Sequence, residues 1–517
     1  MKTLLNVAAL ALLLGGCAHY SKTLAPEALP RAAKLDLDIL AKSGATYSLK
    51  KATVGTDAVI GGGWKYYPDG GKEVFDGRIA FADISLVKTH EIDRVGTLLA
   101  WGAIGVLAVA TADGGGVHDG INVDIRYPST GSGSCPLVFA WDGERYRFES
   151  ETFAGAYGEA LEFTQKECLT HLVPEHGRLR LVLANNAPES HHTNRIALFA
   201  LDHPRGTEVR LGAAGEPYSL REAQPPVRAS AYDSVDVLPL VSTLGDGAWE
   251  SDLERTDRVR DGLVCEFAIP VGARRAKLRI SAHNTGMGEF ALHKLLAMRG
   301  PGRMKWCYEM SSDTSEVRKF RAWQRREGGL EVQVAEDSGW NLQGWLPDVG
   351  GLVHPERIVP LDLGSVREGV VKVRLDATAG LWFIDRVAID FSADEPIRET
   401  AIALEKANAN DGVDVTRPLS EADSLYYATL PGDYATLSYA EVPLKDDQER
   451  TYVLISEGYY HPWVEEGPAD FKPLLDQVLD VPELGQRLYL PEWKKVKNDY
   501  TRLQTEPVFP FAPGPVN

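Results

Sequence analysis

The hairpin signal that decides the fold is CPLVFAWDGERYRFESE, residues 135–151. Two runs in it, Leu137 to Trp141 and Tyr146 to Glu149, are rich in apolar and aromatic residues, and Asp142-Gly143 stands between them. An Asp-Gly pair favours the tight turn that joins two antiparallel strands. This stretch therefore predicts a β-hairpin inside a β-rich body.

Strand-like stretches recur along the rest of the chain. Leu179 to Leu183, Arg195 to Leu201, Val370 to Leu375 and Trp382 to Asp390 alternate or run apolar, as buried strands do. Short strands separated by turn residues are typical of β-sandwiches, whose inner faces need an apolar residue at every second position. The predicted fold class is mainly β, a multi-domain β-sandwich-like architecture with a helical insertion.

Helical spacing interrupts this pattern in a few places. Phe290 to Met298 and Val317 to Arg326 predict a helical pair that packs on a sheet. Arg31 to Lys42 predicts a short helix near the N-terminus, and Phe471 to Leu479 and Glu492 to Tyr500 predict helices near the C-terminus.

These patterns, with the length of 517 residues, predict several domains. The predicted division is a signal segment at 1–17, a tether and short helix at 18–45, a small β unit at 46–94, an apolar segment at 95–112, a Gly/Ser-rich linker at 113–134, a β domain at 135–285, a helical insertion at 286–327, a β-sandwich-like domain at 328–395, a β section at 420–465, and a helical and Pro-rich tail at 466–517.

The N-terminus has the features of an export signal. Lys2 provides a positive start, Leu4 to Leu14 are apolar, and Leu14-Gly15-Gly16-Cys17 follows at once. The last four residues resemble a lipobox, which implies lipidation of Cys17 and cleavage before it. Ala18 after the cysteine, by the same resemblance, implies the outer membrane. We expect a lipid-anchored protein of the cell envelope.

Val95 to Ala112 is an internal run of 18 residues without a charge. As a helix it would be about 27 Å long, close to the roughly 30 Å hydrocarbon core of a bilayer. A membrane-associated segment, spanning or re-entrant, and a buried helix or pair of strands are both compatible with it.

The charge balance bears on the class of partner. The formal charge of −18 becomes −19 without Lys2, and no basic run offsets it. Such a chain repels phosphate backbones, so nucleic-acid binding is disfavoured. Hydrophobic residues at 44% and charged residues at 25% are ordinary for a folded globular protein.

Four cysteines remain beside the lipidation candidate: Cys135, Cys168, Cys265 and Cys307. In an oxidising compartment they allow two disulfides with three connectivities. Two alternatives are open: disulfides between sequence neighbours, Cys135 with Cys168 and Cys265 with Cys307, or four free buried thiols. No zinc-type spacing of Cys and His is present, and no metal or cofactor is predicted.

Catalytic signatures are missing from the sequence. It has no GxSxG nucleophile elbow and no phosphate-binding glycine motif. His191 and His192 lie near Glu189 in PESHHTN, which is interpreted as a solvated loop rather than a metal site. Glu149 and Glu151, two apart in a strand, would share a face, where like charge raises one pKa; an exposed polar face explains them more simply.

Clusters of aromatic residues beside turns are candidates for binding. Trp and Tyr stack on sugars or fill partner pockets, but they also pack in cores. The candidate binding aromatics are Trp64, Tyr66, Tyr67, Tyr459, Tyr460 and Trp463.

Three stretches carry a resemblance to a family: CPLVFAWDGERYRFESE at 135–151, TNRIALFALDHPRGTEV from Thr193 and GLWFIDRVAIDFS from Gly380. They resemble uncharacterised exported bacterial proteins with a CPxxxxWDG motif, which implies a multi-domain β architecture and names no activity. The hypothesis is a non-enzymatic envelope scaffold or binding protein with a protein or glycan partner. The alternative is an envelope polysaccharide hydrolase that uses paired carboxylates.

Overall fold

The computed structural model divides into two compact units. Unit 1 comprises Met1–Tyr127, Ala297–Met304 and Glu465–Asp470, and unit 2 comprises Pro128–Leu296, Lys305–Val464 and Phe471–Asn517. The structure describes residues 19–24, 34–43, 45–66, 72–92, 135–187, 189–255, 258–300, 306, 310, 314–364, 369–429, 432–462 and 470–503.

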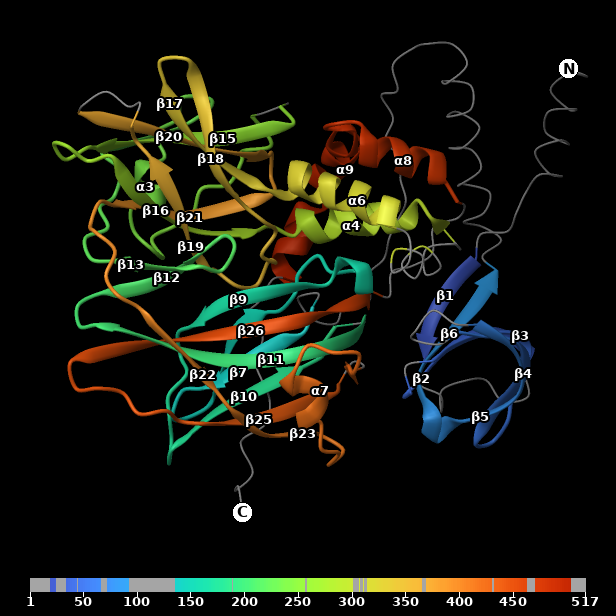
Figure 1. The fold of residues 1–517 in the computed structure, drawn as a ribbon. Helices are drawn as coiled ribbons and strands as arrows, with labels where there is room; N and C mark the ends of the chain where they lie inside the picture. The colour runs from blue at the N-terminus through green and yellow to red at the C-terminus, as the bar shows by residue number, and fades with distance from the viewer. Residues whose placement is uncertain are drawn as a thin grey trace, which may run out of the picture. The chain divides into compact units, whose positions relative to one another are not determined.

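Unit 1 contains a six-stranded antiparallel sheet, shown in blue in Figure 1. Its apolar core includes Leu37, Ile39, Leu49 and Val59, all at most 1% exposed. The strands, in the order β1-β6-β2-β3-β4-β5 across the sheet, are β1 His19–Leu24, β6 Ile84–Ile92, β2 Lys34–Ala41, β3 Thr46–Val54, β4 Ala58–Tyr66 and β5 Lys72–Ala80, with a 3-10 turn at Phe81–Asp83.

One prediction in this unit is wrong. The stretch from Arg31 to Lys42 does not contain a helix, because its described part is strand β2. Leu35, Leu37 and Ile39 alternate with aspartates, which is the period of a strand with one buried face. Two neighbouring strands, β3 and β6, pair with β2 and satisfy its backbone.

Unit 2 begins with a sandwich of two five-stranded sheets, which we call the first sandwich (Figure 1). Both sheets contribute to one apolar core, in which Leu181, Leu198 and Leu454 are buried. One sheet has the order β23-β25-β10-β7-β8, with β23 Leu404–Ala409, β25 Tyr434–Ala440, β10 Arg178–Ala184, β7 Leu137–Trp141 and β8 Tyr146–Glu151. The other has the order β22-β11-β26-β9, with β22 Arg398–Ile402, β11 Glu189–Pro204, β26 Gln448–Pro462 and β9 Phe163–Leu169, and β24 Tyr427–Thr429 pairs with β11.

Two more five-stranded sheets form the second sandwich. They contact each other where Gly344 lies against the Val359 side chain. One sheet has the order β13-β12-β19-β16-β21, with β13 Pro217–Leu220, β12 Glu208–Gly212, β19 Glu356–Asp362, β16 Arg275–Asn284 and β21 Trp382–Asp390. The other has the order β14-β15-β20-β17-β18, with β14 Arg228–Ala231, β15 Arg260–Ala268, β20 Val370–Thr378, β17 Leu330–Glu336 and β18 Gly339–Leu346.

The mainly β fold class is confirmed, but the predicted sequence of separate β domains is not. Residues 135–285 and 328–395 share both sheets of the second sandwich, since β16 pairs with β19 and β21, and β15 pairs with β20. Residues 420–465 complete the first sandwich through β25 and β26. Strands that are far apart in the sequence pair here, and local sequence patterns do not show which strands pair with each other.

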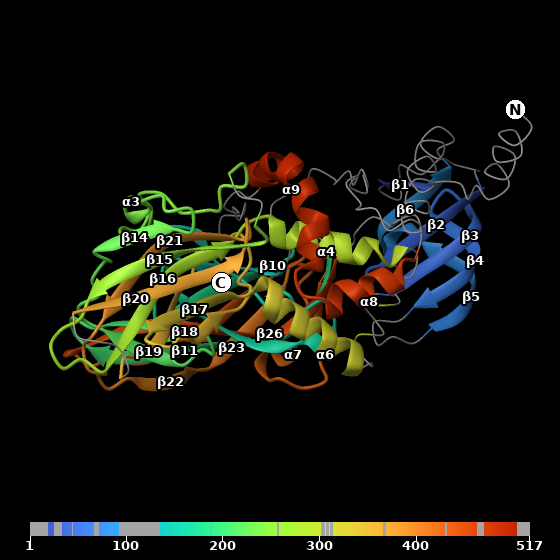
Figure 2. The same ribbon diagram turned by 90° about the horizontal axis from the view of Figure 1, so that it is seen from above.

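The predicted helical pair is confirmed and belongs to a layer of helices. Figures 1 and 2 both show α4, α6, α8 and α9 gathered at one end of the two sandwiches. Within the described residues, the helices whose bounds are given are α3 Leu238–Val241, α4 Met287–Ala297, α6 Thr314–Trp323, α7 Thr416–Ser420, α8 Lys472–Asp480 and α9 Leu484–Leu503, with a 3-10 turn at Glu159–Leu161 and a π-helical turn at Gln324–Gly328.

Several sequence predictions lie outside the described residues: the lipobox with Cys17, the apolar run Val95 to Ala112, the linker at 113–134 and the Pro-rich end of the tail. Among the helices that the structure describes, none is both long and apolar enough to cross a membrane.

Candidate functional site

A cavity of about 50 Å³ lies in unit 2, where the two sandwiches meet the helical layer. Three chain segments form most of its wall: the turn after β8, the step from β16 into α4, and the loop between β18 and β19. We call it the first cavity; it is lined by Cys135, Glu151, Ala154, Gly155, Tyr157, Asn284, Thr285, Gly286, Gly288, Glu289, Asp348, Gly350, Gly351, Leu352 and Tyr460.

The turn after β8 is held by backbone and side-chain hydrogen bonds. Thr152 donates to the carbonyl oxygen of Pro136 from its N–H at 2.9 Å and from its Oγ1 at 3.0 Å. Gly155 has φ +86°, a conformation that glycine adopts without strain. Gln324 Nε2 donates to the Gly155 carbonyl at 3.0 Å, which ties the turn to the helical layer. These contacts fix Glu151 at the end of β8.

The loop between β18 and β19 closes around the Glu151 carboxyl. The Leu352 N–H donates to Glu151 Oε2 at 3.0 Å. Gly350 has φ +84°, and a Cβ there would collide with the same oxygen. Glycine is therefore required at this position both for the backbone conformation and for the close approach.

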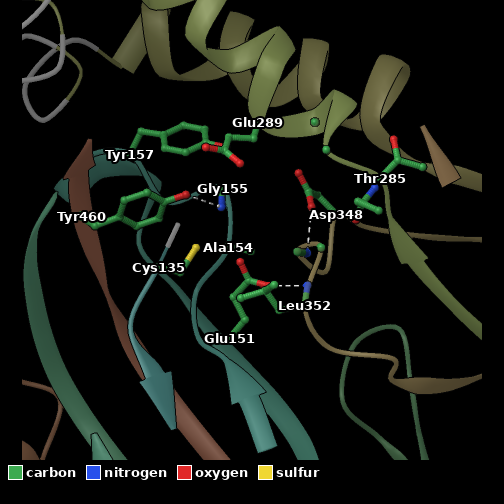
Figure 3. A pocket seen from close by; sticks show the side chains of 15 residues that line it. Cys135, Glu151, Ala154, Gly155, Tyr157, Thr285, Glu289, Asp348, Leu352 and Tyr460 are labelled. Atoms are coloured by element: carbon green, nitrogen blue, oxygen red, sulfur yellow. Dashed lines mark hydrogen bonds between the residues drawn. The ribbon is translucent and has the colours of Figure 1, made fainter. Parts of the chain in front are cut away.

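Three carboxyl groups point into this space without a cation among them. Figure 3 shows Glu151, Glu289 and Asp348 directed toward one another across the first cavity. Burial raises the pKa of Glu151 to about 8, and the nearby acids add to the effect. Burial likewise raises the pKa of Glu289 to about 7, and burial raises the pKa of Asp348. No lysine or arginine is among the described residues that line the cavity.

Glu189 is a further acid behind this wall, and its side chain is buried. Its Oε2 accepts the N–H of Cys135 at 2.8 Å and lies 3.0 Å from His191 Nε2. Burial raises the pKa of Glu189 to about 8 and lowers the pKa of His191 to about 3. Burial therefore favours the uncharged form of both Glu189 and His191.

Asn284 presents a donor at the same cavity. Its Oδ1 accepts the N–H of Val349 at 2.9 Å, and its own N–H donates to the Gly350 carbonyl at 3.0 Å. The Nδ2 group is buried and has no hydrogen-bond partner. Since Oδ1 is already engaged by a donor, Nδ2 is left to donate to whatever occupies the cavity.

Carboxyl groups whose pKa lies near neutrality can accept or donate a proton at physiological pH. A protonated carboxyl also both donates and accepts hydrogen bonds, as a hydroxyl-bearing ligand does. Tyr157 and Tyr460 add two rings to the wall, with centroids 5.1 Å apart in an edge-to-face arrangement. The site therefore combines acid-base capacity with an aromatic wall.

The sequence prediction for the two glutamates on β8 is corrected. Glu149 and Glu151 do not form an exposed polar face, because both side chains are buried. The pairing shifts from Val138–Ser150 to Phe139–Phe148, so Glu149 is the extra residue of a β-bulge and the simple alternation fails. Glu149 accepts the Thr170 N–H at 2.9 Å, whereas Glu151 faces the cavity.

The interpretation of PESHHTN as a solvated loop is also wrong. Glu189 begins β11, and His191 and His192 are at most 5% exposed. The pairing of β11 with β26 buries them, and His192 stacks on Tyr459 with ring centroids 4.6 Å apart.

Neither of the predicted disulfide pairs is formed. Cys168 and Cys265 are free thiols. Cys168 lies on β9, a different sheet from the β7 strand that follows Cys135. Cys265 is fully buried on β15, and Cys307 lies outside the described residues.

The predicted aromatics divide into two groups. Trp64 in unit 1 is 44% exposed, whereas Tyr459 and Tyr460 are buried, and only Tyr460 lines the first cavity. The side chain of Tyr66 and the residues Tyr67 and Trp463 lie outside what the structure describes.

Metal binding by Asp, Glu, His or Cys finds no support in the part of the chain that the structure describes. There, no three such side chains are grouped so that they could hold a metal ion.

Comparisons with known proteins identify no family. No family model matches the chain, and no curated protein matches it. Among solved structures, a β-porphyranase of glycoside hydrolase family 86 from Bacteroides plebeius has 10% identity over 45% of this chain and 37% of its own, with a TM-score of 0.16. A family 31 α-xylosidase from Xanthomonas citri has 12% identity over 82% and 38%, with a TM-score of 0.16. The chain spans less than two fifths of either enzyme, and likenesses at such TM-scores carry no argument about fold or function.

Proposed function

We propose that the protein is a lipid-anchored binding protein of the cell envelope that binds the end of an envelope glycan and takes one of its hydroxyl-bearing groups into the first cavity. The observation that carries the proposal is the convergence of Glu151, Glu289 and Asp348 with the unpartnered Asn284 Nδ2. An anionic ligand would be repelled by this set. A sugar hydroxyl can donate to an ionised carboxyl, accept from a protonated one, and accept from the Asn284 amide.

The small size of the site suits a group that projects from the end of a glycan rather than the middle of a chain. The cavity is small, and its wall is drawn from three separate segments of unit 2. A hydroxymethyl group can displace the few waters that such a space holds and exchange their hydrogen bonds for its own.

The anchor is tested by lipid labelling. Cells grown with a clickable fatty acid are expected to incorporate label into the wild-type protein and none into the Cys17→Ser variant, because the thioether requires the Cys17 sulfur. Fluorescence after gel electrophoresis measures incorporation. An unlabelled wild-type protein, or a mature form that keeps residues 1–17, would contradict the anchor and leave the cavity proposal in place.

Glycan binding is tested with the full-length protein in detergent and fragments of peptidoglycan and outer-membrane polysaccharide. Glu289→Ala is expected to weaken binding about tenfold, the equivalent of about 1.4 kcal/mol, measured by calorimetry. Because Glu289 adds to the crowding of acids, its removal is not expected to destabilise the fold. The control is Glu254→Ala, which removes an exposed carboxylate that is not among the residues lining the cavity. Absence of binding to every glycan would overturn the proposal.

A hydrolase is the second candidate, favoured by the raised pKa of Glu151 and Glu289. A protonated carboxyl can give its proton to the glycosidic oxygen while an ionised neighbour activates water, which then adds to the anomeric carbon. New reducing ends in the same mixtures, absent with Glu151→Gln, would establish this activity; binding without new reducing ends supports the non-enzymatic function.

A further inference from the structure

A second cavity, of about 40 Å³, lies in the helical layer of unit 2. It shares Tyr157, Gly288 and Asp348 with the first cavity, so the two spaces are neighbours along one wall. The rest of its lining comes from α4, from α6 with the π-helical turn, from α9 and from the strand ends at Thr378 and Leu381.

Three polar atoms at the second cavity have no hydrogen-bond partner: Trp323 Nε1, Gln486 Oε1 and Tyr489 Oη. The three residues are 8%, 4% and 3% exposed. A buried polar atom without a partner costs about 1–3 kcal/mol, and native proteins contain few of them. Three around one space indicate a ligand that supplies the missing partners.

The neighbouring polar groups have partners within the protein. Trp382 Nε1 donates to the Gly328 carbonyl at 3.0 Å, and Thr378 Oγ1 donates to the Glu327 carbonyl at 2.6 Å. The Glu327 carboxylate is occupied by Arg326 and by the N–H of Glu483. Among the described residues that line the second cavity, the unpartnered buried side-chain atoms are therefore those of Trp323, Gln486 and Tyr489.

The secondary structure explains how these groups are brought together. Gln486 and Tyr489 are three residues apart on α9, so they lie on the same helix face. Trp323 is the last residue of α6, directly before the π-helical turn Gln324–Gly328. π-turns interrupt regular helix geometry and occur often at functional sites.

The chemistry of the three groups selects the class of ligand. An indole N–H only donates, an amide oxygen only accepts, and a phenol hydroxyl does both. An anion would leave Gln486 Oε1 without a partner, and a cation would leave Trp323 Nε1 without one. A neutral hydroxyl-bearing ligand satisfies all three, and the rings of Trp323 and Tyr489 offer it apolar faces.

We propose that the second cavity, adjoining the first, is a subsite for a small hydroxyl-bearing group of a sugar, of about the size of a hydroxymethyl, in which Trp323, Gln486 and Tyr489 determine specificity. This inference rests on the proposed glycan function and places the C-terminal helix α9 in the binding site. Asp348 and Tyr157 stand between the two spaces and contact ligand groups in both.

The test is Tyr489→Phe in the full-length protein, with glucose, N-acetylglucosamine and glycerol as probes and phosphate and calcium chloride as charged probes. Removal of an unpartnered hydroxyl is expected to leave the melting temperature of the free protein unchanged or higher, and to weaken binding of the best hydroxyl probe about tenfold. Gln486→Met, which removes the unpartnered acceptor at similar size, is expected to do the same.

The matched control is Tyr439→Phe. Tyr439 is fully buried in the first sandwich, and its hydroxyl donates to the Ile196 carbonyl at 2.7 Å. This variant is expected to melt at a lower temperature and to bind the probe with unchanged affinity, the opposite pattern to Tyr489→Phe.

The outcomes separate the two proposals. If a hydroxyl probe binds with an affinity that Glu289→Ala lowers but that Tyr489→Phe and Gln486→Met leave unchanged, the subsite is overturned. The glycan function would then remain supported. Binding of phosphate or calcium in place of hydroxyl probes would overturn the ligand class. Binding of small polyols that depends on Tyr489, without binding of any envelope glycan, would support the subsite and remove the glycan function.

Discussion

The free energy of unfolding is expected to fall by several kcal/mol between pH 6 and pH 9. Burial raises the pKa of Glu151 and of Glu189 to about 8 and that of Glu289 to about 7, whereas an unfolded glutamate titrates near 4.5. The folded protein therefore binds more protons than the unfolded chain across this window, so stability decreases as pH rises. At about 1.4 kcal/mol per pH unit, Glu151 and Glu189 each contribute about 2–3 kcal/mol of the loss.

Glu151→Gln isolates one of these groups, because glutamine resembles a protonated glutamate in shape. The variant is expected to be close to wild type at pH 6 and more stable than wild type by about 2 kcal/mol at pH 9. Urea unfolding at the two pH values, followed by circular dichroism, measures the difference. Glu254→Gln, at an exposed position, serves as control. Parallel pH profiles for wild type and Glu151→Gln would show that Glu151 is ionised in the folded protein.

Buried histidines limit stability on the acid side. Burial lowers the pKa of His191, His283 and His461 to about 3 and that of His192 to about 4, below the 6.5 of an unfolded histidine. Here the unfolded chain binds more protons, so the stability that these groups give above pH 6.5 is lost as pH falls through this range. The glutamates and histidines together place the maximum of stability near pH 6.

Local sequence patterns predicted most helices and strands of unit 2. They failed where the same short pattern is compatible with both a helix and a strand. The Asp142-Gly143 turn and its flanking strands β7 and β8 lie where the hairpin signal places them. The stretches from Trp382 to Asp390 and from Phe290 to Met298 also match β21 and α4 closely. The prediction of a helix near the N-terminus was wrong, because the apolar residues of this stretch alternate with aspartates as in a strand.

Local sequence patterns could not predict the candidate site. Glu151, Glu289 and Asp348 come from a strand end, a helix start and a loop, and no fixed spacing relates them. Only Glu151 was singled out, for a like-charge effect with Glu149, whereas the acids that face it are distant in sequence. The sequence also could not predict that polar atoms of α9 lack hydrogen-bond partners. An amphipathic helix buries Tyr489 whether or not its hydroxyl binds a ligand.

Arg357→Leu is expected to destabilise the protein by about 3–5 kcal/mol. Arg357 on β19 of the second sandwich pairs with Glu167 on β9 of the first, and its side chain also donates to the Lys166 carbonyl at 3.2 Å. The side chains of Arg357 and Glu167 are 7% and 6% exposed. Removal of the guanidinium leaves the Glu167 charge buried with only the Gln165 amide, 3.0 Å away, to stabilise it.

The double variant Arg357→Leu/Glu167→Leu separates this desolvation effect from lost packing. With both charges gone, an apolar pair fills the same junction, and most of the lost stability is expected to return, as double-mutant cycles of the unfolding free energy would measure. A double variant as unstable as Arg357→Leu would show that the arginine acts through its other contacts. Because Glu151 reaches the first cavity from one sandwich and Asp348 from the end of the other, Arg357→Leu is also expected to weaken probe binding, and the double variant to restore it. Such a result would show that the buried ion pair holds Glu151 and Asp348 in the positions that binding requires.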